Sequence, residues 1–466
     1  MNYLWDGDTL LSALDGRPVG DMPEGITGIS IDTRTLIKGE AFFAIKGDQF
    51  DGHDFIPGAM RAGAAVAVVD EKRLVSLGHL KLPLIVVRDV LSAMTRLGEV
   101  ARMRSKAQII AITGSVGKTT TKEMLRTVLS GSGKVHASDA SFNNHWGVPL
   151  TLARLPEDAR FGIFEIGMNH PGEITPLVKM VRPHIAMITA IAPAHIGAFD
   201  SIEEIAKAKA EIYSGVVPGG YGLINHDDRR YTLLRDLAKE ANIEHLMSYG
   251  QKRGSDFWLR DIKSGPDGSS LSVRARGKDN EYQISVPGEH MALNSVGVLG
   301  AAVLMGAELE KSADAMARIE PADGRGTRYS IGGSGAMGIT IIDESYNANP
   351  TSMAAALSVL GEYEGIQTKR RIAVLGDMLE LGKHARKYHE ALAKPISASK
   401  ADLVFLVGAE MENLANILPK EKLGGYFKDA TVLPERLKAT MKPGDVLMLK
   451  ASKSIGFAGV VQALLE

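Results

Sequence analysis

The stretch AITGSVGKTTT, at residues 111–121, constrains the fold and chemistry of this chain more than any other. It follows the apolar run Gln108–Thr113, which predicts a strand, and precedes Lys122–Ser130, which predicts a helix. A glycine-rich turn between a strand and a helix N-terminus directs backbone N–H groups at an anion, and a lysine adds a fixed positive charge. The usual phosphate loop has its first glycine five residues before its second, where this chain has Ile112, so the turn is a shortened variant.

We expect this turn to bind the phosphates of a nucleotide. Lys118 would bridge the β- and γ-phosphates, and Thr119 or Thr120 would offer a hydroxyl to Mg²⁺. A glycine turn with a purely structural role is the alternative, but it does not explain a lysine and hydroxyls at these positions. The predicted ATP-binding residues in the turn are Gly114, Ser115, Val116, Gly117, Lys118, Thr119 and Thr120.

Length and composition narrow the class of protein. A chain of 466 residues with 45% hydrophobic residues should form two or three domains with sizeable cores. Its 54 basic and 55 acidic residues nearly balance, which favours small-molecule substrates over nucleic acid or a membrane surface. The absence of cysteine excludes disulfides and thiolate chemistry. We see no signal peptide and no apolar run long enough to span a bilayer, so we expect a soluble, cytoplasmic protein, and a monomer.

Alternating apolar runs and helical patterns predict an α/β chain of three domains. Residues 1–84 should form a small α/β domain, and residues 85–319 a central, doubly wound, mostly parallel sheet that carries the phosphate loop. Two apparent antiparallel strands within Ser255–Gly288 should lie at the edge of this sheet. Four further apolar runs predict a C-terminal Rossmann-like domain at residues 320–466.

Two candidate metal ligands follow strands of the central domain. Glu165 ends the run FGIFE, and His195 follows the run IAMITAI and a short turn. Ligands of doubly wound sheets bind beyond the carboxyl ends of the strands, so we favour a metal-binding role for both. The alternatives are a carboxylate that caps a helix and a histidine that serves only the fold.

Other polar segments leave two interpretations open. The loop at Phe142–Leu152 is either an ordinary polar loop or a surface that hydrogen-bonds a carbohydrate or peptide, and residues 343–353, DESYNANPTSM, are either an Asx-rich turn or a substrate contact. Lys209 lies in a predicted helix, and its position there alone predicts a charged side chain exposed to solvent. Arg325, at a predicted domain boundary, could reach a phosphate.

Together these segments resemble the ATP-dependent Mur ligases of peptidoglycan synthesis. IDTRTLIKGEAFFAIKGDQFDGHDFIPGAMRAGA resembles the UDP-binding domain of two members of that family, and TGSVGKTTTKEM, FNNHWGVPLTL, FEIGMNHPGEI and AKAEIY occur in the family's order. DESYNANPTSM and VLGDMLELG are similar to the branch that adds D-Ala-D-Ala. Met291, Ala451 and Lys453 depart from the usual family pattern.

The resemblance implies substrates, cofactors and residue roles. The substrates would be ATP, UDP-N-acetylmuramoyl-tripeptide and D-Ala-D-Ala, with Mg²⁺ as cofactor and an acyl phosphate as intermediate. Glu165 and His195 would hold Mg²⁺, and Lys209 would do so as a carbamate. Arg325 would contact the γ-phosphate, Asp343 or Glu344 the ribose and Asn294 the adenine. The implied substrate-binding residues are Thr33, Arg34, Asp51, His53, Asn143, Asn144, Tyr346, Asn347 and Asn349.

Three rival functions remain at this stage. A sister Mur ligase that adds the third peptide residue would differ chiefly in its third-domain motifs. A folylpolyglutamate or cyanophycin-type ligase should lack the first domain and the YNANP run. A P-loop NTPase that switches a partner would need no amide-forming substrate, and it leaves the FNN and YNANP segments unexplained.

Overall fold

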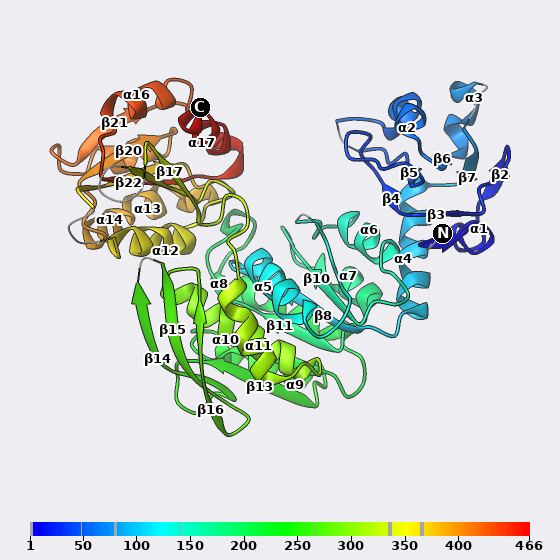
Figure 1. Ribbon diagram of the computed structural model, residues 1–466, viewed down its shortest axis with the longest axis horizontal. Helices are drawn as coiled ribbons and strands as arrows, with labels where there is room; N and C mark the ends of the chain where they lie inside the picture. The colour runs from blue at the N-terminus through cyan, green and yellow to red at the C-terminus, as the bar shows by residue number, and fades with distance from the viewer. Residues whose placement is uncertain are drawn as a thin grey trace.

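The computed structural model folds the chain around three large sheets arranged in chain order (Figure 1). It describes residues 3–466 except 48, 79–81, 140, 266, 334–337 and 364–367. Among these residues no helix has the length and apolar character needed to cross a membrane.

The N-terminal sheet has five strands in the order β2-β7-β6-β5-β4, and only β2 runs antiparallel to its neighbour. The pair β1 (Trp5–Asp6) and β3 (Gly25–Ile26) lies beside helix α1. The strands and helices of this region are β2 (Arg17–Val19), β4 (Ile29–Ser30), β5 (Ala41–Phe43), β6 (Val66–Asp70), β7 (Leu84–Val87), α1 (Gly7–Leu14), α2 (Ile56–Ala62), α3 (Leu74–Leu77) and α4 (Val90–Arg104).

Helix α4 joins the first core to the second region. Its apolar residues, among them Met94 and Leu97, pack in one cluster with Trp5 and with Leu150 of helix α6 (Gly147–Ala153). Strand β7 crosses the predicted boundary at residue 84, because its parallel pairing with β6 continues to Val87. We therefore propose that the first unit extends through α4.

The central sheet has nine strands in the order β16-β15-β14-β13-β12-β11-β8-β10-β9. In this order the seven strands from β9 to β14 are parallel. Strands β15 and β16 continue the sheet beyond β14 with antiparallel pairing, at the edge where the sequence predicts antiparallel strands. The strands are β8 (Gln108–Thr113), β9 (Val135–Ala137), β10 (Phe161–Glu165), β11 (Ile185–Ile188), β12 (Tyr221–Asn225), β13 (His245–Gly250), β14 (Phe257–Gly265), β15 (Gly268–Ala275) and β16 (Lys278–Ile284).

Helices cover both faces of this sheet, because parallel strands carry apolar side chains on both sides. One core contains the apolar residues of α5, α10 and α11, and the other those of α6, α7, α8 and α9. The helices are α5 (Lys118–Ser130), α6 (Gly147–Ala153), α7 (Ile174–Val181), α8 (Ile202–Ala210), α9 (Tyr231–Glu240), α10 (Glu289–Leu304) and α11 (Leu309–Ala315). The predicted doubly wound architecture is confirmed.

The C-terminal sheet has six strands in the order β17-β18-β22-β19-β20-β21, and only β17 is antiparallel. Its elements are β17 (Thr327–Ile331), β18 (Ile339–Asp343), α12 (Pro350–Gly361), β19 (Arg370–Gly376), α13 (Ala385–Glu390), α14 (Ala393–Ala398), β20 (Leu403–Val407), α15 (Met411–Ala415), β21 (Leu423–Phe427), α16 (Leu433–Thr440), β22 (Asp445–Lys450) and α17 (Phe457–Leu465). The four predicted strands are β18, β19, β20 and β22. The strand pattern did not identify β17 or β21, which are the two edge strands.

Candidate active site

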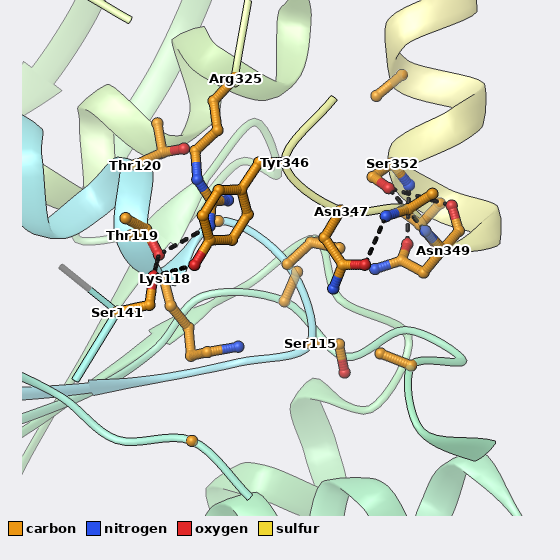
Figure 2. A pocket seen from close by; sticks show the side chains of 18 of the residues that line it. Ser115, Lys118, Thr119, Thr120, Ser141, Arg325, Tyr346, Asn347, Asn349 and Ser352 are labelled. Atoms are coloured by element: carbon orange, nitrogen blue, oxygen red, sulfur yellow. Dashed lines mark hydrogen bonds between the residues drawn. The ribbon is translucent and has the colours of Figure 1, made fainter. Parts of the chain in front are cut away.

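A cavity of about 490 Å³ lies where the central and C-terminal regions meet (Figure 2). The central region contributes the phosphate loop and the ends of β10 and β11, and the C-terminal region contributes the loops after β18, β19 and β22. Predicted site residues on its wall are Ser115, Val116, Gly117, Lys118, Thr119, Thr120, Asn143, Glu165, His195, Asn294, Arg325, Tyr346, Asn347 and Asn349.

The glycine turn takes the form that anion binding needs. Gly117 has a φ of 84° and directly precedes α5, so a left-handed residue aims the first N–H groups of the helix into the cavity. A β-carbon at Gly117 would come within 3.1 Å of Nδ2 of Asn294, the predicted adenine contact on α10. The phosphate loop and the predicted adenine contact therefore lie side by side.

Thr189, a threonine outside the sequence motifs, helps to hold the phosphate loop in place by a hydrogen bond. Thr189 follows β11, and its Oγ1 donates a hydrogen bond to the carbonyl of Val116 at 2.6 Å. The N–H of Ser115 donates to the carbonyl of Ala190 at 2.8 Å. These bonds hold the loop against the end of the neighbouring strand.

Glu165 is almost fully buried, with 2% of its surface exposed, and is held on both carboxylate oxygens. Its Oε2 accepts a hydrogen bond from Thr119 Oγ1 at 2.8 Å, and its Oε1 accepts one from Asn143 Nδ2 at 2.7 Å. A carboxylate beside a hydroxyl at a phosphate loop is a donor set that suits Mg²⁺, which usually takes one or two carboxylates and completes its shell with phosphate and water. Within the described ranges no group of three or more carboxylate or imidazole side chains is close enough to hold a metal alone.

Two lysines lie near the loop: Lys118 is partly buried at the start of α5, and Lys209 is fully buried on α8. Lys118 Nζ donates to the carbonyl of Gly114 at 2.7 Å, and burial lowers its pKa, opposed by the Glu165 carboxylate and assisted by Arg325. Lys209, on α8, is 2% exposed and does not lie on the cavity wall. Burial, and then the charge of Lys118, hold its pKa well below the ordinary value for lysine. The reading of Lys209 as a solvated surface charge is wrong.

His195 makes a contact between the two regions. Its Nδ1 lies 2.7 Å from Oε2 of Glu380, which follows β19 in the C-terminal region, and both residues line the cavity. The N–H of Gly197 also donates to the carbonyl of Glu380 at 3.0 Å.

Another buried lysine, Lys450, makes hydrogen bonds that organise the C-terminal wall. Lys450, 3% exposed at the end of β22, donates to Oε2 of Glu344 and to the carbonyl of Asn347, each at 3.0 Å. Glu344 lines the cavity, whereas the carboxylate of Asp343 accepts the N–H of Ser345 at 2.9 Å and is not among the lining residues. The structure therefore favours Glu344 of the two predicted ribose contacts.

The remaining asparagines serve local turns. Asn349 caps α12, with its Oδ1 accepting the N–H of Ser352 at 2.9 Å, while the residue also faces the cavity. Asn144 Oδ1 accepts the N–H of Gly147 at 2.9 Å at the start of α6, and Asn144 lies off the cavity wall. The DESYNANP segment therefore contains an Asx turn, in which Asp343 accepts the N–H of Ser345, and it also contributes to the cavity wall.

Four predicted substrate-binding residues lie in the N-terminal region, away from this cavity. They are Thr33, Arg34, Asp51 and His53. Arg34 is exposed and pairs with Asp32 at 2.6 Å, whereas His53 is 3% exposed. His53 Nδ1 donates to Asp51 Oδ1 at 2.6 Å, and its Nε2 accepts the N–H of Asp70 at 2.9 Å, so both ring nitrogens hold the loop onto β6.

Several cavity residues were not identified from the sequence. They are Ser141 and Glu380, which are on the cavity wall, and Thr189, which holds the phosphate loop. Glu380 occurs in VLGDMLELG, which carried the family resemblance, but no spacing rule assigns it a partner. Lys450 and Lys453 also line the cavity, and they belong to a segment that departs from the family pattern. The sequence signal that could have located such residues is the end of each predicted parallel strand, here β8, β11, β19 and β22. Loops that follow parallel strands meet at one edge of a sheet, where ligands bind.

Three family models match the chain in succession. They are described as Mur ligase family, catalytic domain (residues 25–114), Mur ligase middle domain (residues 112–302) and Mur ligase, glutamate ligase domain (residues 328–453).

Full-length relatives agree with these matches. The chain is 32% identical to UDP-N-acetylmuramoyl-tripeptide–D-alanyl-D-alanine ligase of Rickettsia prowazekii, over 98% of this chain and 99% of that protein. It is 35% identical to the Synechocystis protein of the same name, over 94% and 92%. A crystal structure of MurF from Acinetobacter baumannii superposes with a TM-score of 0.84 at 29% identity, covering 99% of this chain and 98% of that one. This chain therefore belongs to the Mur ligase family.

Proposed function

We propose that this protein uses ATP to join D-Ala-D-Ala to UDP-N-acetylmuramoyl-tripeptide in the cytoplasm of a bacterium. The relatives' names supply the substrates. The observation that supports ligase chemistry is one cavity that residues of two regions line together. The phosphate loop belongs to the central region, and Arg325, Tyr346 and Asn347 belong to the C-terminal region. A ligase needs this arrangement, because it must bring a phosphoryl donor and two further substrates together.

The reaction divides into two transfers. A carboxylate oxygen of the tripeptide attacks the γ-phosphorus of ATP, which gives an acyl phosphate and releases ADP. The amine of D-Ala-D-Ala then attacks the acyl carbon, loses a proton, and displaces phosphate to leave an amide. Both transfers build up negative charge on phosphoryl or acyl oxygens, so fixed positive charge is the main catalytic requirement.

Residues of this chain supply that charge. Lys118 would turn from the carbonyl of Gly114 towards the β- and γ-phosphates, and Arg325 would approach the γ-phosphate from the other side. Asn294 would contact the adenine and Glu344 the ribose. In the N-terminal region, Thr33, Arg34 and the Asp51–His53 loop would contact the UDP group.

Thr119, Glu165 and His195 would hold Mg²⁺, whose charge supports phosphoryl transfer when it is bound. Lys209 is buried on α8, and its amine makes no hydrogen bond or ion pair with another described residue. Burial disfavours the charged form of this amine and lowers its pKa. Reaction of the neutral amine with CO₂, with loss of one proton, would give a carbamate that can act as an anionic metal ligand. We include this carbamate in the proposal.

Phosphate release by purified protein tests the function. With ATP and Mg²⁺, release should require both the UDP-linked tripeptide and D-Ala-D-Ala, and mass spectrometry should detect the UDP-linked pentapeptide. Equal release with glutamate or diaminopimelate as the amine, or with the peptide omitted, would contradict the proposal.

A further inference from the structure

Arg325 lies against the face of an aromatic ring. Its guanidinium carbon is 4.0 Å from the ring centroid of Tyr346, and the two side chains extend together into the cavity (Figure 2). A guanidinium stacked on a ring is attracted by the negative face of the π-system and loses freedom of rotation. The ring therefore restricts where this long side chain can point.

The backbone keeps the two residues in register. The N–H of Tyr346 donates to the carbonyl of Gly324 at 3.0 Å, and the N–H of Gly326 donates to the carbonyl of Asp343 at 2.8 Å. These bonds lie on either side of Arg325 in the chain. Arg325 and Tyr346 consequently belong to one rigid corner where the C-terminal region begins.

Both side chains of this corner reach the central region. Arg325 Nη2 donates to Thr119 Oγ1 at 3.1 Å, and Tyr346 Oη donates to Ser141 Oγ at 2.8 Å. The two acceptors are themselves 3.3 Å apart (Figure 2). The guanidinium thus lies over the first turn of α5 while the ring is anchored beside it.

We propose that Tyr346 is a positioning residue that presents Arg325 to the terminal phosphate of the nucleotide, rather than a contact for the incoming dipeptide. The inference rests on the proposed function, in which Arg325 contacts the γ-phosphate of ATP. Lys453 lies near the same ring as a second cation, with its Nζ 5.5 Å from the centroid.

Substitutions that separate the ring from its hydroxyl test this role. Tyr346→Phe keeps the stacking surface and should change kcat/KM for ATP by less than about threefold, whereas Tyr346→Leu should lower it about tenfold. The KM for D-Ala-D-Ala should stay unchanged in both. An increase of tenfold in that KM with an unaltered kcat would overturn the proposal.

A double-mutant cycle tests whether the ring acts through the arginine. In an Arg325→Ala background, Tyr346→Leu should have almost no additional effect, because there is no guanidinium left to orient. Additive effects of the two substitutions would contradict the proposal. Tyr363→Leu is the matched control, since that ring lies 5.7 Å from the guanidinium of Arg328 in the same region but off the cavity wall.

Nucleotide binding provides a readout that needs neither the peptide nor the amine. Tyr346→Leu should weaken a non-hydrolysable ATP analogue about tenfold and leave ADP affinity unchanged, because only the triphosphate reaches Arg325. Equal weakening of both nucleotides would overturn the proposal. This experiment remains decisive even if the amine substrate proves to be different, so the two proposals can fail separately.

Discussion

The carboxylate of Glu380 lies 2.7 Å from Nδ1 of His195, and the two residues come from different regions of the chain. Both have left-handed backbones, with φ of 64° for Glu380 and 56° for His195. Such conformations are uncommon for residues with a side chain and persist where surrounding contacts hold them. The pair therefore joins a predicted metal ligand to the loop after β19.

Removing this carboxylate should weaken the contact between the regions. Glu380 is 60% exposed and His195 28%, so the pair is worth at most about 1 kcal/mol. We expect Glu380→Ala to lower kcat/KM for the amine substrate about fivefold, measured by phosphate release. Glu435→Ala, at an exposed position on α16, should have no effect. An unchanged rate in Glu380→Ala would show that the contact does not assist the reaction.

The same contact requires a glycine. A β-carbon at Gly197 would lie 3.0 Å from the N of Gly382 and 3.1 Å from the carbonyl oxygen of Glu380. Gly197→Ala should therefore push the loops apart, raise the radius of gyration in solution scattering and lower kcat. Gly459→Ala, in α17 with open space around it, should instead stabilise the protein by about 0.5–1 kcal/mol. Identical scattering of Gly197→Ala and the native protein would contradict the expected separation.

Thr119 and Thr120 can be distinguished as metal ligands. Of these two threonines, only Thr119 is hydrogen-bonded to Glu165 in the described structure. Thr119→Val keeps the shape of the side chain but removes the hydroxyl, so the Mg²⁺ concentration for half-maximal activity should rise about tenfold. Thr120→Val should leave it within about twofold of the native value. The reverse result would assign the metal to Thr120.

The role of Lys209 can be tested against its neighbour on α8. Lys209→Ala should reduce activity about a hundredfold or more, and short carboxylic acids should restore part of it by replacing the carbamate. Lys207→Ala removes an exposed lysine from the same helix and should leave activity intact. Thermal melting will show whether Lys209→Ala remains folded. A folded Lys209→Ala protein with full activity would exclude the carbamate.

One histidine should make stability depend on pH. Burial lowers the pKa of His136 to about 4, although its Nε2 donates a hydrogen bond to the carbonyl of Thr151 at 2.7 Å. The unfolded chain binds this proton near pH 6.5, so the free energy of unfolding should fall as the pH drops from about 6.5 to 4. His136→Gln should flatten this part of the profile in urea titrations. An unchanged slope would mean that His136 titrates normally.

The sequence by itself determined the phosphate loop, the three-region α/β architecture and the family resemblance. The loop could be recognised because a strand, a glycine turn, a lysine and a helix start are consecutive, and local spacing encodes them fully. The alternation of strands and helices likewise predicted the parallel core and its antiparallel edge. The edge strands β17 and β21 were missed because half-exposed strands carry weaker apolar patterns.

Only the tertiary structure decided which side chains meet. Arg325 and Thr119 are separated by 206 positions, and Tyr346 and Ser141 by 205, yet both pairs are hydrogen-bonded. Periodicity describes the face of one element, whereas these contacts arise when loops from two sheets are packed against each other. The burial of Lys209 follows from the same cause, since a lysine on a helix is exposed or enclosed according to what covers that helix. The sequence therefore indicated the chemistry of the site, and the packing of its regions determined its geometry.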